Sequence, residues 1–379
     1  MSSKSDCVFP YLSLRDWPFR MAADEKSSQV WAGKRKLESE LRAQVRNMRI
    51  ERSAIRLLWG WFGAGKTHSL YYLKKLCDET KNVLYLYTEF SENCASFLDL
   101  YKSFVPRDTS SLGRLYEGVL ARERYNKDVV KDKICSEMPD LQICLEGLTS
   151  GNRNQVDFAK QWLQGQKLPR WDLSKNGYIE RIESDDQAIR TIRSLVSLVG
   201  ASEEFVRIVW AIDEFQKIDS LKKKAAKTPI LEGLYRVFNG SPNRLSLYFA
   251  FSTMKSSDFK PMVSKELAER IGTVPPLEVK LLSKSEAKEF VADLLRIYRC
   301  RNSSTSDAWH PFDEECVDLI LSHIESKGYD MKPRTINDLL DQILIRYDPA
   351  LADGSLSRIG KAEASSVLSD TTARDDQKE

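Results

Sequence analysis

The sequence predicts an α/β protein built on a parallel sheet that helices cover on both sides. Up to residue 282, five short apolar segments alternate with helical patterns. A glycine-rich turn joins the first of these segments to a helical pattern, and after residue 282 the pattern becomes purely helical. Alternating strands and helices are typical of a doubly wound sheet, and the last stretch predicts a smaller helical domain.

The composition sets limits on the class of protein. The chain has 379 residues, enough for two or three domains with cores of their own. Hydrophobic residues make up 42% and charged residues 30%, and the net charge of +3 provides no global basic field for nucleic acid. No apolar run approaches the roughly 20 residues that cross a bilayer, and the first residues lack the apolar core of a signal peptide. We therefore expect a cytoplasmic protein with no membrane partner.

The cysteines predict neither a metal site nor a disulfide framework. They are odd in number and scattered, none forms a CxxC pair, and the three histidines complete no metal-ligand spacing. We expect free thiols in a reducing cytosol. The seven are Cys7, Cys77, Cys94, Cys135, Cys144, Cys300 and Cys316.

The five predicted strands share one composition. Each is a run of β-branched, aromatic and leucine residues, which suits strands buried on both faces. They are SAIRLLWG (53–60), NVLYLYTEF (82–90), VRIVWAIDEF (206–215), RLSLYFAFST (244–253) and TVPPLEVKLL (273–282).

Helical patterns occupy the rest of the chain. Residues 91–205 hold no strong strand and predict a helical insertion, whose last part we expect to cover the sheet. After Leu282, Ser283 and Glu286 have capping-box spacing and open an amphipathic helix. From about residue 351 large apolar residues are few, so we expect a disordered tail. The predicted division is an N-terminal segment (1–30), a nucleotide-binding core (31–282) with the insertion at 91–185, a helical lid (283–350) and the tail (351–379).

The turn after the first strand carries the strongest motif. Residues 60–67 fit GxxxxGK[ST], follow a strand and open a helix, as a phosphate-binding loop requires. Glycines let backbone N–H groups turn towards phosphates, Lys66 reaches the terminal phosphates, and Thr67 is a ligand for Mg²⁺. The alternative is a chance match in a turn. We expect ATP and Mg²⁺ here, with nucleotide contacts from Gly60, Gly63, Ala64, Gly65, Lys66, Thr67 and His68.

The second motif is an acid pair at the end of the third strand. Asp213 suits the Mg²⁺ shell, and Glu214 suits a general base that polarises the attacking water. The alternative is two solvated acids that end an ordinary strand. An adjacent acid pair speaks against a small-molecule kinase, which needs no base for water, so the pair favours hydrolysis.

Three further signals are weaker. Ser252 and Thr253 end the fourth strand, where a polar group would lie beside the γ-phosphate. Arg270 precedes the fifth strand and could reach a neighbouring subunit's nucleotide as an arginine finger. Arg334 starts the last lid helix and could fold back onto the nucleotide. Each also has an ordinary explanation: a turn-favouring serine, a solvated arginine, and arginine after a proline that begins a helix.

In this order the motifs resemble an AAA+ ATPase. The phosphate loop matches the Walker A motif and the acid pair the Walker B motif, and the resemblance covers roughly residues 10–350. Residues 31–41 look like the family's N-terminal box near the adenine, with Gly33-Lys34 in place of a "GR"-like pair. Residues 12–20, LSLRDWPFR, are similar to the opening of the initiator-type group, which includes origin-recognition ATPases and AAA+ regulators of transposition and secretion.

The resemblance implies ATP-dependent assembly into a ring or filament, often on DNA and with a separate protein partner. Two departures qualify it. Origin-binding members usually add a winged-helix domain, and the residues that follow Arg334 are too few to form one. The helical insertion is also longer than that of the initiator-type group. Both favour an adaptor whose target is set by a partner or by the insertion.

Three functions compete. The first is an oligomeric ATPase switch that acts on DNA with a partner protein in transposition, replication or defence. Lys222, Lys223, Lys224 and Lys227 could follow a phosphate backbone, in which case DNA contact would be sequence-tolerant; the alternative is a solvated helix start. The second is a nucleotide-gated signalling ATPase that a protein triggers through the insertion, without nucleic acid. The third, a small-molecule kinase, lacks a recognisable acceptor pocket.

Overall fold

The computed structural model describes residues 7–20, 22–25, 27–104, 109–122, 125–271, 273–301 and 307–375. The chain forms two compact units. The loop-and-lid unit comprises Met1–Glu40, Gly60–Tyr72 and Val279–Glu379, and the sheet unit comprises Leu41–Trp59 and Leu73–Glu278. Each unit is described by itself. Among the described helices, none has the length and apolar character that crossing a membrane requires.

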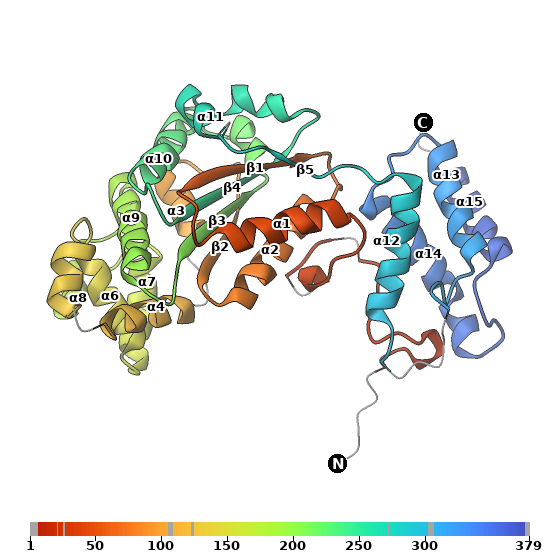
Figure 1. Cartoon of the computed structure of the whole chain (residues 1–379), viewed down its shortest axis with the longest axis horizontal. Helices are drawn as coiled ribbons and strands as arrows, with labels where there is room; N and C mark the ends of the chain where they lie inside the picture. Colours follow the sequence, from red (N-terminus) through yellow and green to blue (C-terminus); the bar gives the residue numbers. More distant parts are fainter. Residues whose placement is uncertain are drawn as a thin grey trace, which may run out of the picture. The chain divides into compact units, whose positions relative to one another are not determined.

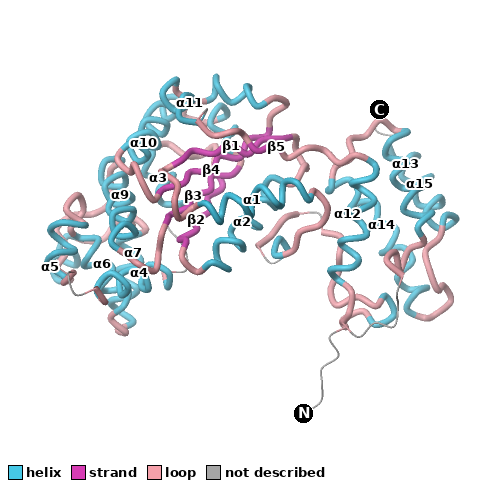
Figure 2. Tube along the Cα trace, viewed as in Figure 1, coloured by secondary structure: helices cyan, strands magenta, loops and turns pink. Residues whose placement is uncertain are grey.

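A five-stranded sheet forms the centre of the sheet unit (Figures 1 and 2). Its order is β2-β3-β4-β1-β5, and the strands β2/β3, β3/β4 and β1/β5 pair in parallel. This confirms the expected parallel sheet, because each predicted apolar segment contains one strand. The strands are β1 (Ala54–Gly60), β2 (Val83–Glu89), β3 (Arg207–Asp213), β4 (Leu245–Ser252) and β5 (Leu277–Glu278).

Alternate residues of the strands face the two sides of the sheet. Ile208, Trp210 and Ile212 of β3 join one apolar cluster with the helices of the insertion. On the opposite face Tyr248 donates to Gln44 of α1 at 2.8 Å. The helices of the sheet unit on these two faces include α1 (Arg35–Asn47), α2 (Lys66–Thr80), α10 (Lys227–Asn239) and α11 (Lys265–Ile271); α1 and α2 each begin in the loop-and-lid unit.

The segment between β2 and β3 is the helical insertion that the sequence predicts. It packs into the same core as the sheet, and Trp162 and Trp210 are both fully buried in that core. The side chain of Trp171, in contrast, is 67% exposed. Its helices are α3 (Phe97–Phe104), α4 (Ser110–Leu120), α5 (Lys127–Val129), α6 (Asp140–Thr149), α7 (Arg153–Leu163), α8 (Arg170–Lys175) and α9 (Asp185–Ala201).

The loop-and-lid unit has a helical core of its own, as expected for a lid. The predicted capping box is present, since Ser283 accepts from the backbone N–H of Glu286 and the Glu286 side chain accepts from that of Ser283. The apolar stripe that follows is buried. The helices are α12 (Lys284–Tyr298), α13 (Glu314–Ser326), α14 (Pro333–Ala352) and α15 (Lys361–Asp375).

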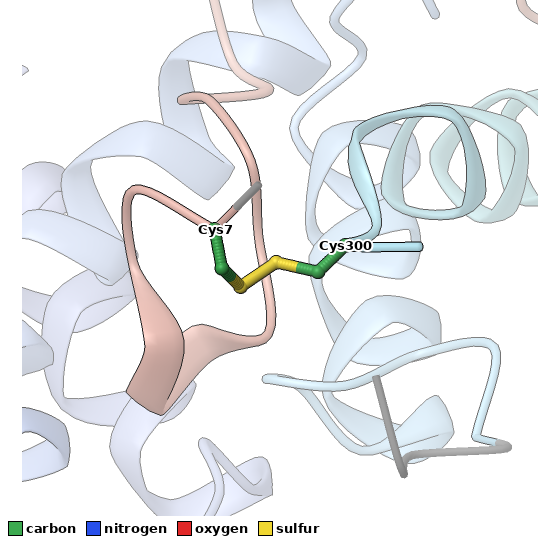
Figure 3. The surroundings of a disulfide bond; sticks show 2 residues. All are labelled: Cys7 and Cys300. Carbon is green, nitrogen blue, oxygen red and sulfur yellow. A yellow bond between two sulfur atoms is a disulfide. The ribbon is translucent and has the colours of Figure 1, made fainter. Parts of the chain in front are cut away.

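The N-terminal segment packs onto this helical core. Leu12, Leu14 and Phe19 are buried in it, and Leu14 forms an antiparallel bridge with Arg299 just after α12. Next to this bridge Cys7 and Cys300 form a disulfide (Figure 3).

The expectation of seven free thiols was therefore wrong for Cys7 and Cys300. The pairing depends on backbone bridging between segments 293 residues apart, which cysteine spacing cannot reveal. The other five cysteines are free and buried.

The expected disordered tail was also wrong for residues 361–375, which form α15. Its composition is mostly small and polar, but Ala364, Val367 and Leu368 recur at helical spacing and are buried in the core of the loop-and-lid unit. Tertiary packing on one narrow apolar face compensates for weak intrinsic hydrophobicity. Residues 376–379 of that tail lie outside the described part of the chain.

Candidate nucleotide and hydrolysis site

The phosphate loop has the backbone that its glycines predict. Gly60, Gly63 and Gly65 have φ of 155°, 73° and 106°, conformations that favour glycine. A Cβ on Gly60 would also lie 2.4 Å from the carbonyl oxygen of Val279, so a side chain cannot fit. Residues 62–65 form a turn and a bend, and α2 begins at Lys66. The first N–H groups of a helix have no hydrogen-bond partners within the helix. In α2 these groups directly follow the glycine-rich loop.

The side chain of Lys66 folds back onto the loop that precedes it. Its side chain is buried, and its ammonium donates to the carbonyl oxygens of Gly60 at 3.0 Å and Trp61 at 2.8 Å. It also lies 5.7 Å from the ring centre of Phe62. The charge is thus held at the loop by neutral acceptors, and a phosphate oxygen could accept from the same ammonium.

A second lysine comes from a distant segment. Lys34 donates to the carbonyl oxygen of Ala64 at 2.8 Å and to that of Lys280. Burial lowers the pKa of Lys34 to about 8; Glu286 nearby raises it and the charge of Lys66 lowers it. Two amines therefore share one loop, and the amine of Lys34 loses its charge as the pH rises above about 8.

The turn that carries Lys34 is anchored to the lid. Gly33 has a φ of 61°, and its N–H donates to the carboxylate of Asp293 on α12 at 2.9 Å. The same buried carboxylate accepts from Arg35 at 2.5 Å. The indole N–H of Trp31 donates to the Gly33 carbonyl at 2.7 Å. The Gly33-Lys34 pair is therefore a rigid bridge between α12 and the phosphate loop.

His68 packs within this turn. Its ring lies 5.6 Å from that of Trp31, which is itself 4.7 Å from the ring of Tyr72. Burial lowers the pKa of His68 to about 4, a hydrogen bond with the backbone of Val30 raises it, and the charge of Lys34 lowers it. His68 is therefore neutral at physiological pH, and these contacts give it a packing role. Its predicted contact with the nucleotide stays a prediction.

Arg334 reaches the loop from the start of α14. A Cβ on Gly63 would lie 3.6 Å from the Cβ of Arg334 and 3.5 Å from the Cδ of Lys332. The Lys332 ammonium lies 5.9 Å from the ring centre of Trp61 and 2.8 Å from Asp330. The structure thus brings Arg334 to the phosphate loop, together with Lys332, which the sequence analysis missed. The signal was present, because Lys332 directly precedes the Pro333-Arg334 pair.

In the sheet unit, the acid pair lies at the carboxyl edge of the sheet. Asp213 ends β3 opposite Glu89 of β2, and its side chain is 1% exposed. One carboxylate oxygen accepts from Tyr87 Oη at 3.1 Å, and the other accepts from the backbone N–H of Glu214 at 2.8 Å. Two donors hold a buried carboxylate in one orientation, as a metal ligand requires.

Glu214 is held by a neighbour that the sequence analysis did not single out. Its backbone is left-handed, with φ of 53° and ψ of 34°, which is uncommon for a residue with a side chain. Gln216 Nε2 donates to Glu214 Oε2 at 2.8 Å. Gln216 Oε1 accepts from the backbone N–H of Ser252, the last residue of β4, at 3.0 Å. Gln216 therefore links the acid pair to the neighbouring strand end.

The polar end of β4 contains one unsatisfied group. Ser252 Oγ is buried and makes no hydrogen bond among the described residues. A buried hydroxyl without a partner costs roughly 1–3 kcal/mol, so such a group in a native structure calls for an explanation. Thr253, the other residue predicted here, is 9% exposed.

Arg270 and the lysine run lie on the surface. Arg270 is exposed in the last turn of α11. Lys222, Lys223 and Lys224 are exposed in the segment after the acid pair. Lys224 donates to the Asp219 carbonyl at 2.5 Å and Lys227 to the Asp219 carboxylate at 2.6 Å.

The donor set fits Mg²⁺ rather than a softer metal. The predicted ligands, the Thr67 hydroxyl and the Asp213 carboxylate, are hard oxygen donors. Within the described residues, no group of three or more His, Cys, Asp or Glu side chains could hold a metal by itself. Mg²⁺ sites commonly combine one or two protein ligands with phosphate oxygens and water.

Comparison with known proteins identifies the fold. No family model matches the sequence, and no curated protein matches it. The structure is similar to Drosophila ORC bound to DNA, with a TM-score of 0.54 and 12% identity over 98% of this chain and 68% of that one. It is also similar to the Aeropyrum pernix ORC2 protein in ADPNP–ADP complexes (TM-score 0.51, 12% identity, 90% and 69% covered) and in the ADP form (0.50, 13%, 88% and 67%).

The chain has the fold of these ORC structures. The resemblance that the motifs carried is confirmed at the level of the fold, together with the helical insertion and lid. At this identity the likeness does not extend to individual side chains.

Proposed function

We propose that this protein is an ATP-binding and ATP-hydrolysing AAA+ switch that oligomerises and acts on DNA together with a partner protein in the cytoplasm. The observation that carries the proposal is the pairing of two features in one chain: a phosphate loop with cations around it, and a hydrogen-bonded acid pair at a strand end.

The phosphate loop and its cations would bind the nucleotide. Lys66 can exchange its bonds with the loop carbonyls for bonds with phosphate oxygens. The backbone N–H groups of the loop and the positive end of α2 favour the same anion. Lys34 and Arg334 would add charge from the N-terminal box and the lid.

The acid pair would carry out the hydrolysis. Mg²⁺ would neutralise phosphate charge when bound, with Thr67 and Asp213 as its protein ligands. Glu214 would orient the attacking water and accept its proton. Ser252, whose hydroxyl lacks a hydrogen-bond partner in the described structure, is our candidate for the group that contacts the γ-phosphate.

The solved structures with this fold support a nucleotide-dependent role on DNA. The Aeropyrum pernix ORC2 structures hold ADPNP and ADP, and the Drosophila ORC structure holds DNA. In this chain, Lys222 and Lys223 would contact the phosphate backbone, whereas Lys224 and Lys227 are engaged by Asp219. No base-reading group was identified in the sequence, so binding would be sequence-tolerant.

ATP turnover with and without duplex DNA tests this proposal. DNA should stimulate turnover, and the stimulation should fall as salt rises because phosphate contacts release counterions. The double variant Lys222→Glu/Lys223→Glu should lose the stimulation and keep basal turnover. Lys167→Glu/Lys175→Glu, two exposed lysines of the insertion, is the matched control. Turnover that DNA never changes would overturn the role on DNA.

Oligomerisation would place Arg270 at a neighbour's nucleotide. The exposed position of Arg270 on α11 suits a finger that acts between subunits. Arg270→Ala should then be inactive alone, and mixing it with Lys66→Ala should restore part of the activity. Failure of the mixture to recover activity would place Arg270 within its own subunit's chemistry or outside the chemistry altogether.

One observation favours the alternative, a nucleotide-gated signalling ATPase that a protein triggers without nucleic acid. On the insertion, Trp171 and Ile179 are 67% and 79% exposed, and large exposed apolar side chains are typical of protein contacts. Under this alternative Trp171→Ala should abolish the stimulation of ATP turnover by the protein trigger, and Lys222→Glu/Lys223→Glu should leave it unchanged.

A further inference from the structure

The geometry points to Gln216 as the positioning residue for the hydrolytic base, coupling the Glu214 carboxylate to the end of β4. This inference rests on the proposed ATP hydrolysis and deepens it. Gln216 is assigned no contact with the nucleotide; it acts through Glu214 and Ser252.

The two hydrogen bonds of Gln216 define the orientation of its amide. Glu214 Oε2 lies 2.8 Å from Gln216 Nε2, and the Ser252 N–H lies 3.0 Å from Gln216 Oε1. A carboxylate can only accept and a backbone N–H can only donate, so the reversed amide would lose both bonds. The side chain is therefore a directional clamp with one end on the base and the other on a strand of the sheet.

The support behind the clamp is rigid. Gln216 belongs to the short helix Phe215–Ser220, whose first residue is fully buried. The Phe215 ring stacks on that of Phe249 in β4, with ring centres 4.6 Å apart, and meets Phe90 and Phe251 edge-on. Packing of this kind holds the backbone of Gln216 fixed relative to β4.

The clamp has a consequence for catalysis. A glutamate has three side-chain torsions, and a base that samples several rotamers spends less time in line with the attacking water. One hydrogen bond of Gln216 holds the Glu214 carboxylate. The other ties Gln216 to the backbone of Ser252, our candidate for contact with the γ-phosphate. A shift of the β4 end on nucleotide binding would thus reach the base through a single side chain.

A matched pair of glutamines tests the inference. Gln187 makes the same kind of bridge in the insertion, donating to the Glu180 carboxylate at 2.8 Å and accepting from the Glu183 N–H at 2.9 Å. We would measure single-turnover ATP hydrolysis and ATP affinity for Gln216→Ala, Gln187→Ala and Glu214→Gln. Gln216→Ala should hydrolyse about 10- to 100-fold more slowly with affinity unchanged. Gln187→Ala should match the wild type in both.

Gln216→Glu supplies a second readout. It keeps an acceptor for the Ser252 N–H but places another carboxylate against Glu214, which should raise the pKa of the base. The acid limb of the pH–rate profile should therefore move to higher pH, an effect that a merely structural residue would not produce. If Gln216→Ala fails to fold, the pH profile of Gln216→Glu still tests whether Gln216 positions Glu214.

The outcomes separate the two proposals. If Glu214→Gln is inactive while Gln216→Ala hydrolyses at the wild-type rate, or Gln216→Glu leaves the pH profile unmoved, the clamp is wrong and the proposed function stands. If Glu214→Gln itself hydrolyses ATP normally, the assigned base is wrong and the clamp has no role to support.

Discussion

The phosphate loop and the acidic strand end are built in opposite ways. The loop collects cations from segments far apart in sequence. Lys66 comes from the loop itself, Lys34 from the N-terminal box, Arg334 from the start of α14, and Lys332 from the residue just before that helix. The strand end collects its polar groups mostly locally, with Asp213, Glu214 and Gln216 within four consecutive residues. One region concentrates positive charge, and the other orients two carboxylates by hydrogen bonds.

This difference separates binding from chemistry. Positive charge around a loop attracts phosphates in the ground state and the transition state alike, so it contributes to affinity. An oriented base acts on the attacking water only as the bond forms, so it contributes to rate. Changes in the loop environment should therefore alter ATP affinity, and changes at the strand end should alter turnover.

Lys66→Ala should have the largest effect on affinity. A charge-assisted bond to phosphate contributes about 1.5–3 kcal/mol, so affinity should fall roughly 10- to 100-fold. Titration with a fluorescent ATP analogue would measure it. Lys75→Ala is the control on the same helix, where the lysine pairs with Glu79 at 3.5 Å. Equal affinity of Lys66→Ala and wild type would remove the loop from binding.

Lys34 should make ATP affinity depend on pH. Burial lowers the pKa of Lys34 to about 8, so its amine is charged below that pH and neutral above it. Affinity should fall about three- to tenfold as pH rises from about 7 to 9, because a charge-assisted bond becomes a neutral one. Lys34→Arg keeps its charge and should show a flatter profile. A wild-type profile in Lys34→Met would contradict this role.

Lys332→Ala should have the smallest effect. The ammonium is shared between Trp61 and Asp330, and partly exposed contacts of this kind contribute less than about 1 kcal/mol. Affinity should change less than fivefold, by roughly the factor that this energy allows. A loss as large as that of Lys66→Ala would mean that Lys332 itself binds phosphate.

The sequence predicted what local patterns encode and missed what tertiary packing creates. The strands, the phosphate loop and the capping box at Ser283 each depend on neighbouring residues, so their patterns are visible in the chain. The Cys7–Cys300 disulfide and the contact of Lys332 with the loop depend on segments meeting in space. Disorder was expected of the segment that forms α15 because it has few large apolar residues, yet Ala364, Val367 and Leu368 are buried in the core.

Gln216 was missed for a different reason. It lies two residues after Glu214, where a short helix turns its amide back towards the carboxylate. Spacing alone does not distinguish this glutamine from an ordinary surface residue, because the left-handed backbone at Glu214 sets the direction of the turn.

The most direct test of the separation between binding and chemistry is ATP affinity and steady-state turnover measured together on Glu214→Gln. General-base catalysis contributes about 10²–10⁴-fold, so turnover should fall by that order. ATP affinity should stay at the wild-type value, because the glutamine keeps the size of the side chain and the phosphate loop is untouched. Normal turnover in Glu214→Gln, or loss of binding and turnover together, would contradict the account.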